Sequence, residues 1–112
     1  MDKDGRPSGS VLRVFEARSK TGCAETLAEK FTTTSVEVVQ GQPGNQGYFF
    51  GRSIQSEDDV FMFVSVWKDL AAIKVLFGED WESSYLPPGY ADLIEDCSLK
   101  HIALARDWYS SE

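Results

Sequence analysis

The sequence contains few of the side chains that bind metals. Cys23 and Cys97 stand in opposite halves of the chain, no C-x-x-C pair occurs, and there is one histidine, His101. This pattern excludes the common zinc and haem-attachment motifs, so we expect neither a metal nor a cofactor. The two cysteines are then expected to be buried free thiols.

Basic residues are also few, and no apolar run is long enough to span a membrane. Eleven lysines and arginines face eighteen acidic residues, which gives a net charge of −7. Nucleic acids and anionic membranes are bound through cationic groups, so we expect neither as a partner. The amino end shows no basic region followed by an apolar core, which argues against a secretory signal and predicts a cytoplasmic protein.

Apolar residues, in contrast, are plentiful. They make up 42% of the 112 residues, which predicts one globular domain with one core. Only the two ends have the composition of disordered segments. We therefore expect a domain over residues 11–106 between tails at residues 1–10 and 107–112.

The stretch VFMFVSVW, residues 60–67, predicts a strand that is apolar on both sides. Read with a period of two, one side carries Phe61, Phe63, Ser65 and Trp67, and the other carries Val60, Met62, Val64 and Val66. Strands with one face in water alternate apolar and polar residues. Both faces of this strand must therefore be covered.

The remaining elements follow from periodicity and from the residues that end helices. Helical spacing predicts a first helix, weakened by its threonine run and ended by Gly41, and a second helix ended by Gly78. An irregular segment, residues 79–96, includes one helical turn at residues 90–94. In chain order we predict a strand at 11–18, a helix at 23–40, strands at 47–54 and 60–67, a helix at 70–77 and a strand at 97–106.

The order βαββαβ is that of the ferredoxin-like α+β fold, a four-stranded antiparallel sheet with two main helices on one face. The third strand then lies in the middle of the sheet, in agreement with its apolar composition. Nothing else in the sequence is long enough to cover the second face, and a wet apolar sheet would exceed the patches that monomers tolerate. We therefore expect a homodimer in which two sheets close a dimeric α/β barrel.

Three segments then resemble a known family. FVSVWKDLAAIKVLFGEDW, preceded by PGNQGYFFGR and followed by LIEDCSLKHIALA, is similar to the antibiotic biosynthesis monooxygenase family of dimeric α/β-barrel proteins over residues 11–106. The most specific features are Trp67 with Lys68 and Asp69, the FGEDW sequence, and a late strand with His101. The resemblance implies a pocket between the sheet and the helices, lined in part by Trp67.

The resemblance implies three kinds of activity. Members oxidise aromatic polyketide anthrones with dioxygen and no cofactor, degrade haem, or process small oxidised signalling molecules. Active members often carry an asparagine on the first strand, which falls here at Val14, and the one asparagine of the chain is Asn45. The axial histidine of haem-degrading members falls near Phe77, so haem is not expected.

A cofactor-free oxygenase needs aromatic walls and a group that accepts a proton. His101 is the side chain with an ordinary pKa near neutrality, and we expect it to be the base, or else a core or interface histidine bonded to a carbonyl. Trp67 is expected to position the substrate, or else to fill the core. The predicted ligand-pocket residues are Phe63, Trp67, Trp81, Tyr85 and Tyr90, of which the two tyrosines form a lid or simply pack.

Two arginines stand inside predicted strands. Arg13 and Arg52 are flanked by apolar residues, where a charge is costly unless it is paired. The first interpretation is an ion pair with Glu16 or with an acidic residue of the partner. The alternative is that one of them contacts an anionic ligand.

Two classes of function remain. The first is a cofactor-independent monooxygenase, or a related enzyme, that acts on an aromatic or quinone-like small metabolite. The second is a non-catalytic dimeric protein of the same fold, small-molecule-binding or stress-related, that holds an apolar or aromatic molecule between sheet and helices.

Overall fold

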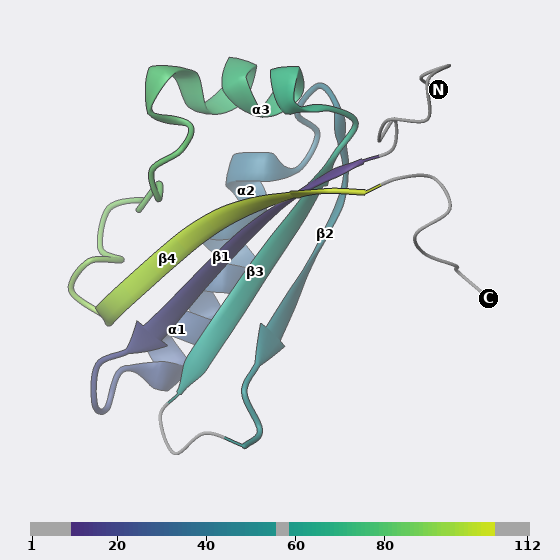
Figure 1. Cartoon of the computed structure of the whole chain (residues 1–112). Coiled ribbons are helices and arrows are strands. Elements are labelled where there is room, and N and C mark those ends of the chain that lie inside the picture. The colour runs from purple at the N-terminus through teal and green to yellow at the C-terminus, as the bar shows by residue number, and fades with distance from the viewer. Residues whose placement is uncertain (1–9, 56–58, 105–112) are drawn as a thin grey trace.

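The computed structural model describes residues 10–55 and 59–104 (Figure 1). Four strands and two helical regions follow the predicted order βαββαβ, which confirms the ferredoxin-like α+β fold. The predicted tails, apart from Ser10, and the end of the last predicted strand at residues 105–106 lie outside these residues. The elements are β1 (Val11–Ser19), α1 (Ala24–Lys30), η1 (Phe31–Ser35), α2 (Val36–Val39), β2 (Asn45–Arg52), β3 (Val60–Trp67), α3 (Leu70–Phe77), η2 (Gly78–Asp80) and β4 (Ile94–Ala103).

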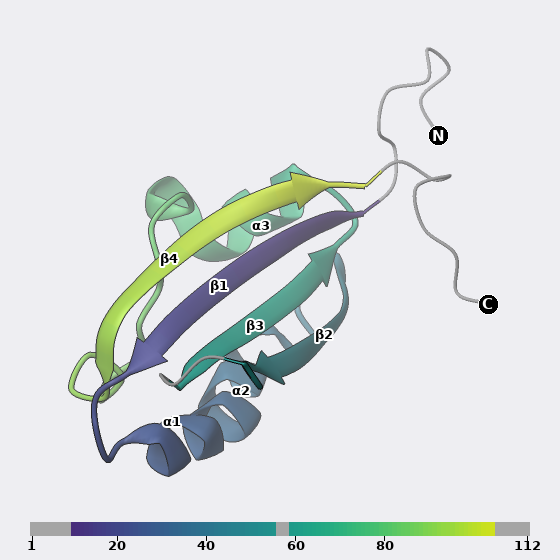
Figure 2. The same cartoon turned by 60° about the horizontal axis from the view of Figure 1, so that its bottom comes forward.

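The strands form one antiparallel sheet in the order β2-β3-β1-β4 (Figures 1 and 2). The predicted central position of β3 is therefore confirmed. Both helical regions pack on one face, since Trp67 at the end of β3 lies against Val39 of α2 and Ile73 of α3. No helix in the described part of the chain is long and apolar enough to cross a membrane.

The register decides which side chains share a face. Arg13 of β1 lies opposite both Ser65 of β3 and His101 of β4, so the three residues are neighbours on the helix-covered face. Val14 lies opposite Val64 and belongs to the other face. The helix-covered face is where the candidate site lies.

The first helix is not regular along its length. One helix was predicted over residues 23–40, but the threonine run forms a π-helical turn, η1, between α1 and α2. The hydroxyls of Thr32 and Thr33 donate to the carbonyl of Glu29, which competes with regular helix hydrogen bonds. The Tyr90 hydroxyl also donates to the Lys30 carbonyl, at 2.8 Å, so a side chain distant in sequence takes a carbonyl of the helix as its acceptor.

Three element boundaries differ from the prediction. β2 runs from Asn45 to Arg52 rather than over 47–54, and β4 begins at Ile94 rather than at 97. Ile94 pairs with Ser19 past an irregularity in the β1–β4 register, which extends the edge strand. The expected helical turn at 90–94 is wrong, because the chain forms hydrogen-bonded turns before entering β4.

Both cysteines are free, as predicted, but neither is buried. Cys23 is half-buried at the start of α1, and Cys97 is exposed on β4. Cys97 lies on the edge strand opposite Ala17, a position with no further strand to cover it. The burial prediction was therefore wrong.

The opposite face of the sheet, called the open face below, has no helix over it in the described structure (Figure 2). The register places on it the apolar residues Leu12, Val14, Phe49, Val60, Met62, Val64, Val66 and Ile102, interrupted by the polar and charged residues Glu16, Arg18, Asp96, Ser98 and Lys100. Phe49 is 49% exposed and Ile102 is 39% exposed. The second side of β3 is therefore part of an apolar surface that no helix of the described residues covers, and at its centre Val14 and Val64 are already buried by their neighbours.

Candidate functional site

A cavity lies between the helix-covered face of the sheet, the helices and the segment after α3. Its volume is about 40 Å³, and it opens to solvent at its mouth. Its walls are mostly apolar and aromatic, and the polar side chains that reach it include Arg13, Ser35 and Ser65. The lining residues are Arg13, Phe15, Ser35, Val38, Val39, Phe63, Ser65, Phe77, Tyr85, Pro87, Tyr90 and Leu99.

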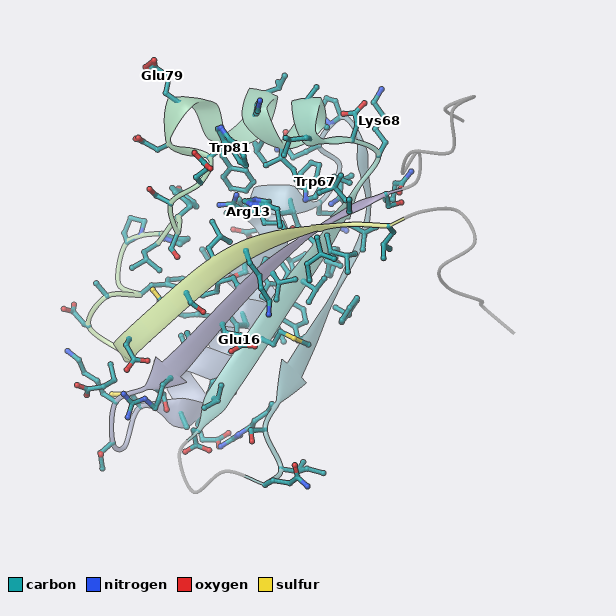
Figure 3. All side chains as sticks on the ribbon, in the orientation of Figure 1. Arg13, Glu16, Trp67, Lys68, Glu79 and Trp81 are labelled. Carbon is teal, nitrogen blue, oxygen red and sulfur yellow. The ribbon has the colours of Figure 1, made fainter. Side chains whose placement is uncertain are left out.

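Arg13 is the charged side chain of this cavity. Its alternation within β1 turns it toward the helices, and it is 5% exposed. The guanidinium donates from Nη1 to the Trp81 carbonyl at 2.6 Å and from Nη2 to the Ser83 carbonyl at 3.3 Å. The Phe77 ring covers one side, with its centre 3.7 Å from Cζ. Arg13 is thereby fixed between the sheet and the segment after α3 (Figure 3).

The third acceptor of Arg13 is the Nε2 atom of His101, 3.0 Å from Nη1. A guanidinium can only donate, so Nε2 must accept and the imidazole proton sits on Nδ1. Burial lowers the pKa of His101, the positive charge of Arg13 lowers it further, and Glu82 opposes both effects. His101 is therefore neutral at pH 7, but its basic nitrogen is occupied by Arg13.

No carboxylate among the described residues pairs with Arg13. Its three partners are two backbone carbonyls and a neutral imidazole. Burial lowers the pKa of Arg13 to about 10, which still leaves it protonated at neutral pH. Among the described residues, no carboxylate therefore bonds to this positive charge, and the carboxylate that acts on the neighbouring His101 is that of Glu82.

Trp67 lies behind the cavity rather than in its wall. It is completely buried and packs with Val39, Ala72 and Ile73. Its Nε1 donates to the Ser65 hydroxyl at 2.9 Å, and Ser65 does line the cavity. Trp67 and His101 are on the same face of the sheet. Trp67 itself does not line the cavity, but it is hydrogen-bonded to Ser65, which does.

The other predicted pocket residues divide in two groups. Phe63, Tyr85 and Tyr90 line the cavity. Trp81 is not among the lining residues: its carbonyl binds Arg13, and its ring meets the His101 ring edge-on with the centres 5.0 Å apart. The proposed lid residues also differ, since Tyr85 is 53% exposed whereas Tyr90 is buried.

Tyr90 is fixed by its hydroxyl. Because that proton goes to the Lys30 carbonyl, the Tyr90 oxygen accepts from the Ser35 hydroxyl at 2.6 Å. Burial raises the pKa of Tyr90, and the Ser35 hydrogen bond opposes this shift. Tyr90 is therefore a neutral phenol that joins the cavity wall to η1.

The two strand arginines have different environments. The predicted pair of Arg13 with Glu16 is wrong, because the alternation of β1 places them on opposite faces. Arg52 does form ion pairs, with Glu25 at 3.1 Å and Asp59 at 2.7 Å. The alternation of β1 was the signal that could have placed Arg13 inside the cavity.

The residues of the site do not fit a haem. The chain has one histidine, and its Nε2 is bound by Arg13, while Phe77 occupies the place counted for an axial ligand. Val14, counted as the first-strand asparagine position, faces away from the cavity, and Arg13 is its inward neighbour. Within residues 10–55 and 59–104, no cluster of acidic, cysteine and histidine side chains could hold a metal ion.

An outer groove adjoins the cavity. The two share Val38, Phe77 and Tyr85, and the groove adds the acidic residues Glu37 and Asp80. Tyr85 stands between the two spaces, and its ring centre is 6.2 Å from that of Phe77. A molecule that moves from the groove to Arg13 therefore meets the side chains that line both spaces, Tyr85 among them.

Solved structures show the same fold. Protein SO0527 from Shewanella oneidensis is 20% identical with a TM-score of 0.69, covering 87% of this chain and 92% of that one. The haem-degrader MhuD from Mycobacterium tuberculosis, solved with two haems in its active site, is 17% identical with a TM-score of 0.64, covering 87% and 97%. SnoaB, a cofactor-independent oxygenase from Streptomyces nogalater, is 15% identical with a TM-score of 0.63, covering 92% and 98%.

No curated protein sequence matches the chain. The family model described as antibiotic biosynthesis monooxygenase matches residues 10–83. This range includes β1, the first helical region, β2, β3 and α3, and with them most of the cavity. The chain therefore belongs to the antibiotic biosynthesis monooxygenase family.

Proposed function

We propose that this protein is a cofactor-independent monooxygenase, or a closely related enzyme, for an aromatic or quinone-like small molecule. The observation that supports this best is the cavity itself, with aromatic walls and one buried, unpaired cation at Arg13. Flat aromatic molecules pack on such walls. A cation in an apolar site stabilises negative charge that develops on a substrate.

The proposed reaction is the oxidation of an anthrone-type methylene by dioxygen. A base removes one proton, and the carbanion, stabilised as an enolate, transfers electrons to dioxygen as a carbon–oxygen bond forms. The peroxide anion takes a proton back from the protonated base, and the resulting hydroperoxide loses water to leave a quinone carbonyl. The cavity shields these species from bulk water.

His101 is the proposed proton acceptor, and Trp67 is proposed to act through Ser65. His101 is neutral at pH 7, as a base must be. Its Nε2 becomes free only when Nη1 of Arg13 leaves it, for instance to bind the enolate oxygen of the substrate. Binding and base activation would then be coupled.

Oxygen uptake tests this function directly. We expect the wild type to consume dioxygen with an anthrone and to form one quinone for each dioxygen used. His101→Ala and Trp67→Phe should lose most of this turnover while circular dichroism shows that they remain folded. Wild-type protein that binds an anthrone but gives no uptake above the uncatalysed rate would contradict the enzymatic proposal.

A non-catalytic binding protein is the second candidate, because the basic nitrogen of His101 is already occupied. If that arrangement persists when ligand binds, the cavity contains no free base near Arg13. The uptake assay separates the two candidates, since a binding protein would hold the aromatic molecule and leave dioxygen untouched.

The homodimer is part of the same proposal. The open face combines apolar residues of all four strands, and a second copy offers an identical surface related by a two-fold axis. Its exposed members include Phe49 and Ile102 on the two edge strands. Pairing two open faces would cover the second side of β3.

A further inference from the structure

We infer that the inner end of the cavity is an anion subsite, built from Arg13 and Ser65, that selects aromatic molecules with an ionised oxygen. This inference deepens the proposed function by naming a substrate class: aromatic carboxylates, phenolates or enolates. It depends on four features of the described residues, which concern charge, hydrogen-bond donors, orientation and access.

The first feature is charge. Arg13 is only 5% exposed, and none of its partners is negative. An unpaired buried charge is costly, whereas one that meets an opposite charge and good hydrogen bonds is tolerated. Arg52 shows the contrast, because it is on the surface and pairs with Glu25 and Asp59. The missing counter-charge of Arg13 is therefore a role that a bound anion can fill.

The second feature is the supply of donors. A guanidinium has five N–H groups, and the described structure uses three of those of Arg13. One on Nε and one on Nη2 remain. Every fully buried side-chain nitrogen and oxygen among the described residues has a partner, so the Nε atom, which has none, is not fully enclosed and is free to donate.

Ser65 adds a further donor. It lies directly opposite Arg13 across the β1–β3 pair, lines the cavity and is 2% exposed. Its oxygen accepts from Nε1 of Trp67, which leaves its own O–H to donate. Trp67 is thus a positioning residue that orients the Ser65 hydroxyl toward an incoming oxyanion.

The third feature is orientation. The carbonyls of Trp81 and Ser83, together with Nε2 of His101, fix one edge of the guanidinium, and Phe77 covers a side of it. The remaining edge is held in place before a ligand arrives. Such preorganisation reduces the entropy lost on binding. The same contact keeps His101 neutral, because its Nε2 accepts from Arg13 and the charge of Arg13 lowers its pKa.

The fourth feature is access. Aromatic side chains line both the cavity and the adjoining outer groove, so a ring that enters from the groove can place an attached oxygen at Arg13. The acidic residues Glu37 and Asp80 belong to the groove rather than to the inner end. They do not neutralise Arg13, and they disfavour anions that remain outside.

The test compares 2-naphthoate with 2-naphthamide, which have similar shapes and differ in charge. Naphthalene fluorescence reports binding to the wild type, Arg13→Gln, Ser65→Ala and the control Arg52→Gln. We expect naphthoate to bind the wild type roughly tenfold to a hundredfold more tightly than the amide, because charge-assisted hydrogen bonds are involved. Arg13→Gln should bring the ratio to about one, Ser65→Ala should lower it several-fold, and Arg52→Gln should leave it unchanged.

The glutamine side chain in Arg13→Gln keeps an N–H donor for the Trp81 carbonyl, and thermal melting verifies that the variant is folded. If that variant does not fold, the wild type still decides, since naphthoate should raise its melting temperature and naphthamide should not. A wild-type ratio near one, an unchanged ratio in Arg13→Gln, or no binding of either probe would overturn the subsite. If naphthoate binds more tightly than naphthamide but no oxygen uptake occurs, the subsite stands and the oxygenase proposal is refuted. If oxygen uptake occurs but the two probes bind equally, the oxygenase proposal stands and the subsite is refuted.

Discussion

At the scale of single residues, the site depends on the inward side of β1. Arg13 and Phe15 face the cavity, whereas Val14, at the position counted from the family pattern, faces away. A count along the sequence that is wrong by one residue exchanges the two faces of a strand. The chemistry of this cavity therefore depends on Arg13, which is held in place by His101 of β4 and by the carbonyls of Trp81 and Ser83 in the segment after α3.

Trp67 and His101 show how much of the site the sequence could provide. The family resemblance implied that Trp67 lies on the helix-covered face, whereas the face of His101 was left open; the register places both on that face. Their contacts could not be predicted, because the Arg13–His101 bond joins residues 88 positions apart and the cavity depends on how the 81–90 segment packs. Periodicity predicts which face of the sheet a side chain occupies, but it does not predict the cavity that distant segments form over that face.

The first residue-scale prediction concerns pH and His101. Its folded pKa lies below the ordinary 6.5, so near and below pH 6.5 the unfolded chain binds more protons than the folded one. The free energy of unfolding should therefore fall as pH decreases from 7.5 through 6.5, until the folded state is protonated as well. Urea denaturation at pH 7.5, 6.5 and 5.5 measures this.

His101→Gln is the matched variant, since its amide oxygen can still accept from Arg13. It should show a smaller loss of stability over the same range. The lowered pKa of Asp96, caused by Arg18, acts below about pH 3.8 and so does not interfere. An equal loss in wild type and His101→Gln would contradict the account of this histidine.

At the scale of elements, the first helical region is shaped both by its local sequence and by a tertiary contact. Its start, its end at Gly41 and its weak threonine run could be predicted, since each is a local signal. The π-helical turn could not, because the hydroxyl that enters it belongs to Tyr90 in the segment before β4. β4 likewise begins early because its neighbour β1 supplies hydrogen-bond partners.

Tyr90→Phe tests the connection between η1 and the cavity wall. It removes the hydroxyl that donates to Lys30 and leaves Ser35 without its partner, so it should cost about 1–3 kcal/mol of unfolding free energy. Tyr85→Phe is the control, because that side chain is half exposed and should change stability by less than about 0.5 kcal/mol. Chemical denaturation measures both, and equal effects would refute the role assigned to Tyr90.

Gly44 tests the contact between the turn before β2 and α3. Its φ is +86°, and a Cβ there would stand 2.5 Å from the Cβ of Ala72. Gly44→Ala should therefore cost roughly 2–4 kcal/mol, from backbone strain and overpacking together.

Gly41→Ala separates these two contributions. Gly41 has a similar φ of +76°, but a Cβ there would meet nothing within 4 Å. That variant should cost only about 1–2 kcal/mol, the backbone part alone. If the two alanine variants melt at the same temperature, the packing of Gly44 against α3 is not as described.

At the scale of the whole molecule, the two faces of the sheet have different proposed roles. The helix-covered face contains the cavity, and the open face is the proposed surface for a second copy. The apolar pattern of β3 predicted both, because a strand without a wet side must be covered twice. That a second copy of the chain supplies the second cover was inferred because no other segment is long enough, and it stays a prediction.

Light scattering measures this assembly. The wild type should have twice the mass of one chain, and Ile102→Glu should shift it toward the monomer by placing a charge on the open face. Val75→Glu is the control, since Val75 on α3 is 80% exposed and lies away from that face. A monomeric wild type, or dissociation by both variants alike, would contradict the proposed dimer.

The most direct measurement of the central claim is a crystal structure of the protein with 2-naphthoate bound. The account predicts the naphthalene ring beside Phe15, Phe63 and Phe77, with the carboxylate accepting hydrogen bonds from Arg13 and Ser65. A ring bound in the outer groove or on the open face, with the guanidinium of Arg13 contacting protein atoms alone, would contradict it.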